Sequence, residues 1–357
     1  MLCAMSYVKK VIVALSGGVD SAVTAALLKK QGFEVAGVFF RFFDGAASRK
    51  SLEKAKKISK TLRVSLKIVD ARKEFKKKII DYFIESFKRG LTPNPCVVCN
   101  KEMKFRLLFD LMRKYKADYV ATGHYARKVK CQKSNVKSKE RITYKLLKAK
   151  DELKGQSYFL YRLNQKDLAK IIFPLGDYKK SEIKKLAKKL KLPTLKNESQ
   201  DVCFLGEKNT ADFLRKNLQL KEGKIVDEKG KILGKHKGLP LYTLGQRKGI
   251  EIGGKGPYFV VRKNLLSNEL VVTNNPKKLL TKIFFVSGAN WISGQPKFPL
   301  RAKVQTRYRA ERFSATIRKV RSEKWEVRSE KPLRAVTPGQ AAVFYKNREV
   351  LGGGIIL

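Results

Sequence analysis

The stretch Val11-Ile-Val-Ala-Leu-Ser-Gly-Gly-Val-Asp-Ser-Ala-Val23 decides the fold of the first half of the chain. Its apolar residues Val11–Leu15 predict a buried strand, and Ala22–Gln31 predicts a helix that begins at about Asp20. Between them lies a Ser-Gly-Gly turn. Its backbone N–H groups can approach phosphate oxygens, and the start of the helix adds a favourable dipole. The stretch therefore predicts a phosphate-binding loop between a strand and a helix.

The side chains of this loop suit nucleotide chemistry. Ser16 and Ser21 can donate hydroxyl hydrogen bonds to phosphates, and Asp20 is placed to hold Mg²⁺ beside them. The loop has neither the spacing and Gly-Lys-Ser/Thr ending of a Walker loop nor the pattern GxGxxG. The alternative interpretation is a glycine turn that binds no ligand.

Apolar strands and lysine-rich helices alternate as far as residue 205. We predict strands at Glu34–Phe40, Ser65–Val69 and Asp118–Thr122, and helices at Ser51–Leu62, Phe75–Phe87 and Lys104–Lys116. Strands separated by helices of this length predict an α/β fold, a doubly wound parallel sheet with helices on both faces.

The pattern changes near Leu205. Short segments punctuated by glycines follow, and from about Lys282 strand-like runs such as Lys324–Arg328 and Gln340–Tyr345 dominate. We predict a catalytic domain over residues 1–205, a small mixed central domain over 206–275 and a β-barrel over 276–357. The polar stretch Cys131–Lys139 is predicted to be an exposed loop or hairpin.

The charge balance indicates a polyanionic partner. The 357 residues include 80 Lys and Arg against 31 Asp and Glu, a formal net charge of +49. Such a field attracts nucleic acid, although many lysines of a lysine-rich protein are only solvated surface. No apolar run approaches the roughly 18 residues of a spanning helix. Met1–Lys10 has no signal-peptide pattern, so we expect a cytoplasmic protein.

Two of the five cysteines stand in the segment Thr92-Pro-Asn-Pro-Cys-Val-Val-Cys-Asn-Lys-Glu-Met-Lys-Phe105. The prolines predict that Cys96 lies in a stiff loop, with a helix starting near Cys99. Positive charge from Lys101 and Lys104, together with the helix dipole, would favour the thiolate of Cys99. A zinc site is the alternative interpretation of the CxxC pair. It lacks a second half, because the chain has only two histidines, His124 and His236.

A third cysteine, Cys203, stands in Ser199-Gln-Asp-Val-Cys-Phe-Leu205. Taken alone, it is best interpreted as a buried, inert cysteine. Beside a nucleotide-activating loop, two separated cysteines suggest sulfur transfer, in which one thiol carries a persulfide and the other resolves it. Cys3 and Cys131 are assigned no function, and no disulfide framework is expected.

The loop Ser16–Ser21 resembles that of the N-type ATP pyrophosphatases, which cleave ATP between its α- and β-phosphates. Over nearly its whole length the chain resembles the tRNA-specific 2-thiouridylase family. The motifs that carry this resemblance are Asn94-Pro95, Cys99-Asn-Lys-Glu102, Ala121-Thr-Gly-His-Tyr-Ala-Arg127, Gly155-Gln-Ser-Tyr-Phe-Leu160, Ser199-Gln-Asp-Val-Cys-Phe204, Tyr242-Thr-Leu-Gly-Gln-Arg-Lys-Gly249, Thr306-Arg-Tyr-Arg309 and Pro338-Gly-Gln340.

The resemblance implies an ATP-dependent 2-thiolation of the wobble uridine in tRNA. ATP and Mg²⁺ would bind at Ala14, Leu15, Ser16, Gly17, Gly18, Val19, Asp20, Ser21, Phe40 and Gly123. The uridine would be adenylated at its 2-oxygen. Cys203 would carry the attacking persulfide, and Cys99 would complete the transfer. The persulfide would come from a cysteine desulfurase or a sulfur-relay protein.

The resemblance also implies a set of tRNA contacts: Asn94, Pro95 and Cys96 around the flipped uridine, Lys154, Gly155, Gln156, Arg307 and Tyr308 on the anticodon arm, and His124 and Gln340 in discriminating the correct tRNA. A structural histidine that caps a strand end is the alternative interpretation of His124. The segment before Gln156 departs from the family, because relatives usually have Asp where this chain has Gly155.

A second departure concerns Cys96, which stands where many relatives have Asp. Three thiols then become available, and an iron–sulfur cluster held by Cys96, Cys99 and Cys203 is a hypothesis beside the persulfide cycle. Other open interpretations are a 4-thiouridine or 2-thiocytidine synthetase and a catalytically silent RNA-binding protein. The lysine-rich helix predicted at Tyr178–Leu192 would place Ile183, Leu186 and Leu190 on one face and its lysines on the other faces, toward solvent or tRNA.

Overall fold

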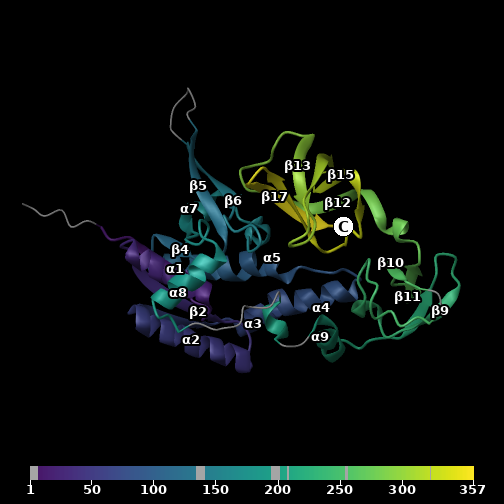
Figure 1. Cartoon of the computed structure of the whole chain (residues 1–357), viewed down its shortest axis with the longest axis horizontal. Helices are drawn as coiled ribbons and strands as arrows, with labels where there is room; N and C mark the ends of the chain where they lie inside the picture. Colours follow the sequence, from purple (N-terminus) through teal and green to yellow (C-terminus); the bar gives the residue numbers. More distant parts are fainter. Residues whose placement is uncertain (1–6, 134–140, 194–201, 207–208, 254–255, 322) are drawn as a thin grey trace, which may run out of the picture.

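The computed structural model describes residues 7–133, 141–193, 202–206, 209–253, 256–321 and 323–357. Its first part is a parallel five-stranded sheet in the order β3-β2-β1-β4-β7 (Figure 1). The strands are β1 (Lys10–Ala14), β2 (Glu34–Arg41), β3 (Ser65–Asp70), β4 (Tyr119–Ala121) and β7 (Ile171–Ile172). The strand order reverses at β1, which pairs with β2 on one side and β4 on the other. Ligands of open parallel sheets bind at this switch point, beyond the carboxyl ends of the strands.

Strand β1 is buried on both faces. Val11 and Val13 pack into one hydrophobic cluster, whereas Ile12 packs into another on the opposite side of the sheet. A strand covered on both faces is the mark of a doubly wound sheet. The α/β prediction is therefore confirmed.

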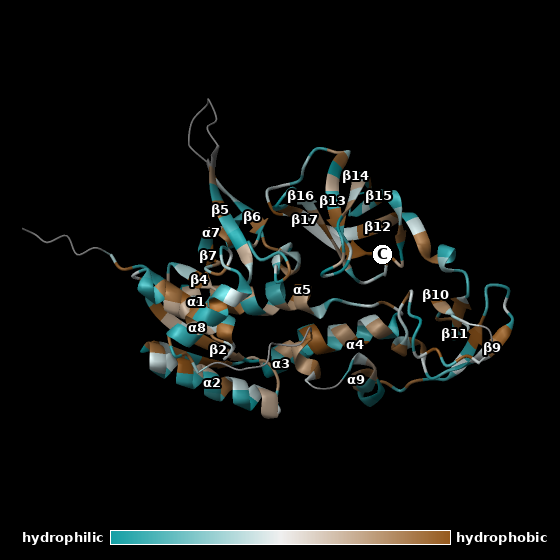
Figure 2. Cartoon of the chain, viewed as in Figure 1, coloured by the Kyte–Doolittle hydropathy of each residue, from teal (hydrophilic) through white to brown (hydrophobic). Residues whose placement is uncertain are grey.

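The helices that cover the sheet include α1 (Val19–Lys30), α2 (Ala46–Leu62), α6 (Arg106–Lys114), α7 (Gln165–Lys170) and α8 (Lys180–Lys189). Hydrophilic and hydrophobic residues alternate around α2 in Figure 2, as expected of a helix with one face on the sheet. Helix α2 begins five residues before the predicted Ser51. In the part of the chain that the structure describes, no helix is both long and apolar enough to cross a membrane.

Two helical segments, one of which includes α6, are longer than predicted, and each contains a π-helical turn. The first runs through α3 (Arg72–Phe75), a π turn (Lys76–Ile80) and α4 (Asp81–Lys88). The second runs through α5 (Pro95–Cys99), a π turn (Asn100–Phe105) and α6. Proline suits the first helical turn, where its missing N–H has no partner to lose. The prediction that Cys96 lies in a loop is therefore wrong, because the helix already starts at Pro95.

The middle of the chain forms its own small sheet in the order β10-β11-β8-β9. Its strands are β8 (Gly223–Val226), β9 (Ile232–His236), β10 (Phe259–Asn264) and β11 (Glu269–Thr273), preceded by helix α9 (Thr210–Asn217). Ile225, Val260 and Leu270 are buried in a separate hydrophobic cluster. This part therefore has a core of its own.

The last part is a closed barrel, as predicted. It consists of β12 (Leu280–Trp291), β13 (Leu300–Gln305), β14 (Phe313–Arg321), β15 (Lys324–Arg334), β16 (Ala341–Lys346) and β17 (Glu349–Ile356). Pairing of β12 with β17 closes the ring.

A hairpin of β5 (Ala126–Lys133) and β6 (Arg141–Lys148) extends the barrel sheet through the pair Leu147 and Glu349. The predicted hairpin at Cys131–Lys139 thus begins in β5, and its residues from 134 onward lie outside the described ranges.

Gly17 is a position where the fold requires glycine. Its φ is +80°, and a Cβ there would lie 2.4 Å from the backbone oxygen of Ser51 in α2. The neighbouring Gly18 has φ −85°, and a Cβ would meet only the Ser16 hydroxyl, at 3.5 Å. The two glycines of the loop therefore differ in what they tolerate.

We expect Gly17→Ala to lower the free energy of unfolding by about 1–3 kcal/mol, because left-handed backbone strain adds to the clash with α2. Gly18→Ala is the matched control and should change it by less than about 1 kcal/mol. Urea denaturation without nucleotide measures both. Equal losses in the two variants would contradict the assignment.

Candidate active site

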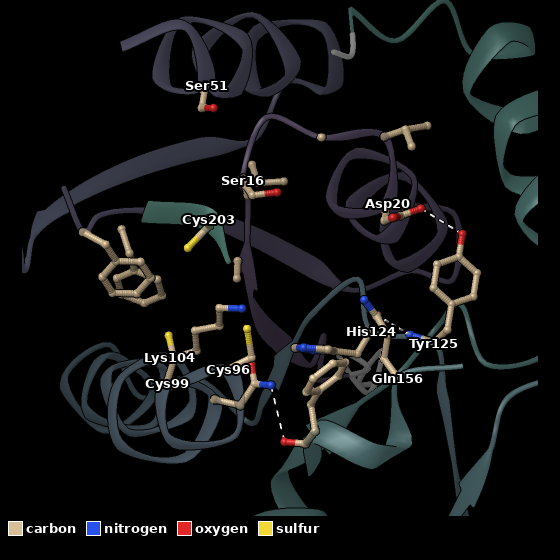
Figure 3. A pocket seen from close by; sticks show the side chains of 18 of the residues that line it. Ser16, Asp20, Ser51, Cys96, Cys99, Lys104, His124, Tyr125, Gln156 and Cys203 are labelled. Carbon is tan, nitrogen blue, oxygen red and sulfur yellow. Dashed lines mark hydrogen bonds between the residues drawn. The ribbon is translucent and has the colours of Figure 1, made fainter. Parts of the chain in front are cut away.

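A cavity of about 750 Å³ lies beyond the carboxyl ends of β1 and β2, at the switch point of the sheet. Its walls come from the loop Ser16–Asp20, the helix that starts at Pro95, helix α8, the turn at Cys203, and Tyr308 and Arg309 of the barrel. Figure 3 shows the loop on one side and the three cysteines together on the other. Segments far apart in the sequence therefore share one space.

The loop is held in shape by its own hydroxyl groups. The Ser16 N–H donates to Ser21 Oγ (3.1 Å), and Ser21 Oγ donates to the Gly18 carbonyl (2.9 Å). Ser21 is 4% exposed and does not line the cavity, whereas Ser16 and Gly18 do. Gly123 packs against the first turn of α1, where a Cβ would lie 2.9 Å from the backbone carbon of Asp20.

Asp20 is bound by two side chains. Lys180 Nζ lies 2.7 Å from both carboxylate oxygens, and the Tyr125 hydroxyl donates to Oδ1 at 2.8 Å. Lys180 is only 9% exposed, so the prediction that every lysine of this helix faces solvent or tRNA is wrong. Leu190, predicted to share one face with Ile183 and Leu186, is 43% exposed. Helix α8 ends at Lys189, which leaves Leu190 beyond its last turn.

One wall of the cavity is aromatic. Phe40, at the end of β2, lines the cavity and stacks on Phe42, with ring centroids 5.6 Å apart. Phe42 stacks in turn on Phe75 at 4.9 Å. A flat, apolar wall of this kind suits a purine ring.

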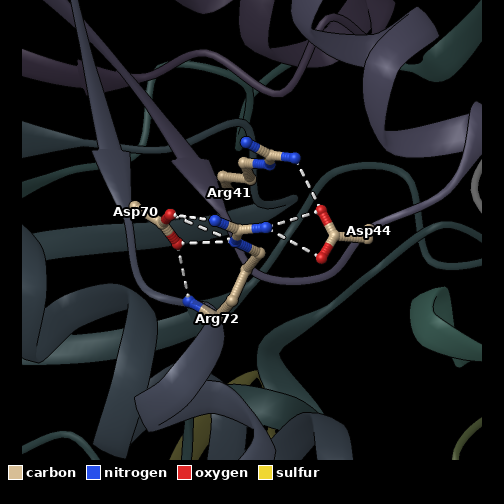
Figure 4. A network of polar contacts seen from close by, with 4 residues as sticks. All are labelled: Arg41, Asp44, Asp70 and Arg72. Carbon is tan, nitrogen blue, oxygen red and sulfur yellow. Dashed lines mark hydrogen bonds and ion pairs between the residues drawn. The ribbon is translucent and has the colours of Figure 1, made fainter.

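A network of ion pairs pins the segment that follows β2 (Figure 4). Arg72 contacts Asp44 (2.8 Å) and Asp70 (2.5 Å), and Arg41 contacts Asp44 (2.6 Å). Side-chain and backbone hydrogen bonds from Arg72 lower the pKa of Asp70 to about 2. Because these groups are more than a third exposed, the network orients the segment and adds little stability.

All three cysteines of the predicted site line the cavity. Cys96 and Cys99 lie one helical turn apart in α5. The Cys96 side chain is half-buried and that of Cys99 is buried, whereas Cys203, in a separate turn, is exposed. The π turn that follows Cys99 carries Lys104 into the cavity wall, since hydrogen bonds from i to i+5 lengthen each turn by a residue. Figure 3 shows the Lys104 ammonium pointing toward the sulfur atoms.

Burial favours the protonated form of two of the three thiols, Cys99 and Cys203. Burial raises the pKa of Cys99 to about 12, although Lys104 acts in the opposite direction. Protein also surrounds the Cys203 thiol on most sides, although solvent reaches it through the cavity, and this desolvation raises its pKa. The prediction that Cys99 is poised as a thiolate is therefore wrong for the resting site, because desolvation outweighs the nearby positive charge.

Lys104 is coupled to the cysteines around it. Burial acts to lower its pKa, whereas negative charge on Cys99, Cys203 and Cys96 raises it above the ordinary value, so ionisation of a thiol favours the ammonium form of Lys104. Among the described residues, no carboxylate forms an ion pair with it. Lys101, predicted to act beside Lys104, instead pairs with Asp167 at 2.6 Å and does not line the cavity.

Cys203 is held in place by the residue that follows it. It opens a short 3₁₀ turn, Cys203–Leu205, and Phe204 packs against Phe75, Phe83 and Phe213 with ring centroids 5.3–6.0 Å apart. This aromatic anchor was not identified from the sequence, although Phe204 belongs to the quoted motif. The preceding Ser199, Gln200 and Asp201 lie outside the described residues.

His124 lines the cavity as a neutral imidazole. Burial, with a contribution from Lys104, lowers its pKa to about 3. Its Nδ1 lies 2.8 Å from Thr122 Oγ1, and its ring stacks on Phe105 with centroids 5.9 Å apart. These contacts fit the structural interpretation and leave the ring at the cavity surface.

The other predicted RNA-contacting residues occupy three places. Pro95 lines the cavity, and Asn94 directly precedes it as the N-cap of α5. Lys154 and Gln156 line another wall, where Gln156 Oε1 accepts from the Tyr125 N–H at 3.1 Å. The remaining members are Gly155, next to these two, and Arg307, Tyr308 and Gln340 in the barrel part, of which Tyr308 lines the cavity.

Residues that the sequence did not single out complete the cavity. Tyr125 and Lys180 hold Asp20, and Phe159 packs on Tyr308 with ring centroids 4.5 Å apart. Lys180 was hidden among many lysines. In a helix with lysines on every face, the sequence does not indicate which lysine is buried.

The donor set does not fit a metal by itself. Within the described ranges, no three Cys, His, Asp or Glu side chains are grouped closely enough to hold an ion. The three thiols share the cavity without forming such a group, so the iron–sulfur hypothesis does not fit this arrangement. Both Asp20 oxygens are occupied by Lys180, so Mg²⁺ at Asp20 remains a prediction tied to the arrival of ATP.

The three parts of the chain match the domain models of known protein families. Three domain models match in order: a tRNA methyl transferase HUP domain over residues 9–207, a tRNA methyl transferase PRC-barrel domain over 211–274, and an aminomethyltransferase β-barrel domain over 281–356. Together they span most of the chain.

Full-length relatives carry a more specific name. The tRNA-specific 2-thiouridylase MnmA 2 of Aliarcobacter butzleri is 39% identical over 373 residues, which cover 99% of each chain. The tRNA-specific 2-thiouridylase MnmA of Buchnera aphidicola is 40% identical over 364 residues, covering 98% of this chain and 96% of the relative.

Among solved structures, the chain is similar to the U34-tRNA thiolase NcsA from Methanococcus maripaludis with its [4Fe-4S] cluster, at 22% identity and a TM-score of 0.38. That match covers 59% of this chain and 67% of the other. A TM-score of this size supports no inference about a cluster. The full-length identity is decisive: the chain belongs to the tRNA-specific 2-thiouridylase family.

Proposed function

We propose that this protein catalyses the ATP-dependent 2-thiolation of the wobble uridine in tRNA. The observation that carries the proposal is that one cavity joins the Ser-Gly-Gly loop to three thiols and the half-buried Lys104. Activation of a carbonyl oxygen and delivery of sulfur to the same carbon need these two sets of groups within one space. The names of the full-length relatives support the same reaction.

ATP would bind across the switch point. The backbone of Ser16–Gly18 and the start of α1 suit the phosphates, and Phe40 offers a face for the adenine. Lys180, now paired with Asp20, stands close enough to the loop to meet the phosphates once the nucleotide competes for it. Mg²⁺ bound with ATP would neutralise phosphate charge and withdraw electron density from the α-phosphorus.

The first step makes a leaving group. The 2-oxygen of uridine attacks the α-phosphorus of ATP, and pyrophosphate departs. The 2-oxygen of the base is then bonded to the phosphorus of AMP. AMP leaves carbon 2 far more readily than the original carbonyl oxygen would. Pro95 and Cys96, at the start of α5, line the side of the cavity where a flipped base would meet the thiols.

The sulfur steps use Cys203 and Cys99. The terminal sulfur of a Cys203 persulfide attacks carbon 2, and AMP leaves. Cys99 then attacks the Sγ atom of Cys203. The electron pair of the broken S–S bond goes to the base sulfur, which yields 2-thiouridine and a Cys99–Cys203 disulfide. In the alternative order, Cys99 first releases sulfide, which then attacks carbon 2.

Both orders oxidise two thiols, so an external dithiol reductant must restore them. The sulfane sulfur must come from a persulfide donor, either a cysteine desulfurase or a sulfur-relay protein. Lys104 suits either order, because its ammonium group can stabilise anionic sulfur at the moment it forms.

The RNA would cover the mouth of this cavity. Arg307 and Tyr308 of the barrel, with Lys154 and Gln156 of the first part, offer charge and ring faces for an anticodon arm. The net charge of +49 supplies the long-range attraction. A tRNA substrate agrees with the cytoplasmic location expected from the sequence.

The decisive experiment incubates the protein with unmodified tRNA, Mg²⁺-ATP, a cysteine desulfurase and cysteine, followed by nucleoside mass spectrometry. We expect 2-thiouridine from the unaltered protein and a loss of at least 10³-fold with Cys203→Ser, roughly the size of removing a covalent nucleophile. Cys131→Ser is the matched control and should retain full activity, because Cys131 lies in β5 and does not line the cavity.

Other outcomes of this assay separate the alternatives. A thionucleoside other than 2-thiouridine would keep the chemistry and change the substrate. Normal activity of Cys203→Ser would remove the persulfide role. Bound tRNA with no thionucleoside, under air or without oxygen, would favour a silent RNA-binding protein.

The resting state of Cys99 makes a separate prediction about pH. A pKa near 12 means that its thiolate fraction rises about tenfold for each pH unit beyond pH 9, where an ordinary thiol levels off. Iodoacetamide labelling of the folded protein between pH 8 and 10.5, followed by peptide mass spectrometry, should show this continuing rise. Urea-unfolded protein is the control and should level near pH 9. A plateau in the folded protein at pH 8 would mean that Cys99 is already activated.

A further inference from the structure

The segment 89–94, here called the connector, leads from α4 directly into the cysteine helix at Pro95. Its central residue, Thr92, is bound on both sides by the barrel. The Thr92 N–H donates to the Pro338 carbonyl at 2.9 Å, and Gln340 Nε2 donates to the Thr92 carbonyl at 2.7 Å. The backbone three residues before Pro95 is therefore fixed by residues about 250 positions later.

The contact is close enough to require glycine. Gly339 has φ +90°, and a Cβ there would lie 3.0 Å from both Leu91 Cβ and the Thr92 nitrogen. The residues 335–340, here called the barrel turn, thus lie directly against the connector. A side chain at this point would push the two segments apart.

A second link joins the same two regions. The Tyr158 hydroxyl donates to the Ala341 carbonyl at 2.8 Å, in a buried position next to the barrel turn. Tyr158 also hydrogen-bonds the Asn94 side chain. The connector is therefore held at Thr92 and again at Asn94, the residue that caps the cysteine helix.

The other side of the barrel turn faces outward. Arg307 Nη2 donates to Thr337 Oγ1, and Thr337 Oγ1 donates to the Ala335 carbonyl at 2.8 Å. Thr337 is 2% exposed, whereas Arg307 is exposed. A continuous set of hydrogen bonds thus runs from a surface arginine, through the barrel turn, to the connector.

We propose that Gln340 is a positioning residue. It holds the connector so that Cys96 and Cys99 enter the cavity at the right place, and the barrel turn thereby couples RNA docking at Arg307 to the sulfur chemistry. The inference rests on the proposed function and assigns Gln340 a role through the protein backbone. This role uses one N–H of the Gln340 amide on Thr92, and it is separate from any contact of the second N–H or of Oε1 with tRNA.

The test compares three variants by hydrogen–deuterium exchange and by kinetics. Gln340→Ala removes the side chain, and Gln340→Glu keeps its shape but replaces the donor with an acceptor that repels the Thr92 carbonyl. Arg348→Ala is the matched control. It removes another contact of the barrel with the first part, Arg348 Nη2 to the Ala149 carbonyl at 2.6 Å, away from the connector.

We expect amide exchange in residues 89–99 to accelerate about five- to tenfold in both Gln340 variants, the opening that loss of one hydrogen bond produces, and to stay unchanged in Arg348→Ala. In the thiolation assay kcat should fall about tenfold, while the Kd for tRNA changes less than twofold. This exchange measurement needs no turnover, so it decides the positioning role even if the reaction proves to be another.

Unchanged exchange in the Gln340 variants would overturn the proposal. A raised Kd with unchanged kcat and exchange would do so as well, and would assign Gln340 to direct RNA contact. Equal acceleration in Arg348→Ala would show general loosening of the barrel and would also overturn it.

Discussion

The burial of β1 on both faces is the constraint on which the rest of the structure depends. Strand β1 ends at Ala14, and the chain leaves it through Ser-Gly-Gly at the point where the strand order reverses. Gly17 then packs on α2 and Gly123 on α1, at distances that leave no room for a side chain. The protein itself therefore shapes the loop, and the hydroxyl group of Ser21 contributes to that shape.

The sulfur side of the cavity is assembled from long-range packing. One helix delivers Cys96 and Cys99, its π turn brings Lys104 to the same wall, and a 3₁₀ turn anchored by Phe204 delivers Cys203. Desolvation raises the pKa of Cys99 and Cys203, and negative charge on the cysteines raises that of Lys104. Under the proposed function, such a site would keep its thiols unreactive in the absence of substrate and would stabilise an anion once one forms.

The features that depend on short stretches of sequence could be predicted from the sequence alone. The apolar run at Val11 and the glycine turn predicted the parallel sheet, the strand-like runs after Lys282 predicted the barrel, and the later motifs carried the resemblance to the family. Predictions were wrong where tertiary contacts and burial overrode the local signal. Lys101 forms an ion pair with Asp167, Lys180 forms one with Asp20, and burial favours the thiol form of Cys99 over the expected thiolate. The start of the cysteine helix was also misjudged, since Pro95 was interpreted as a loop residue although proline suits a first helical turn.

The β5–β6 hairpin sets an order of events during synthesis. Leu147 pairs with Glu349, which is 202 residues later (349 − 147), and the Arg348 side chain bonds the Ala149 carbonyl. At 5–20 residues per second, a ribosome needs roughly 10–40 s to supply that partner. During this interval the outer edge of β6 stays an unpaired strand, open to association with other chains. Strand β6 itself carries Lys145 and Lys148, and their charge discourages such association until the barrel closes beside it.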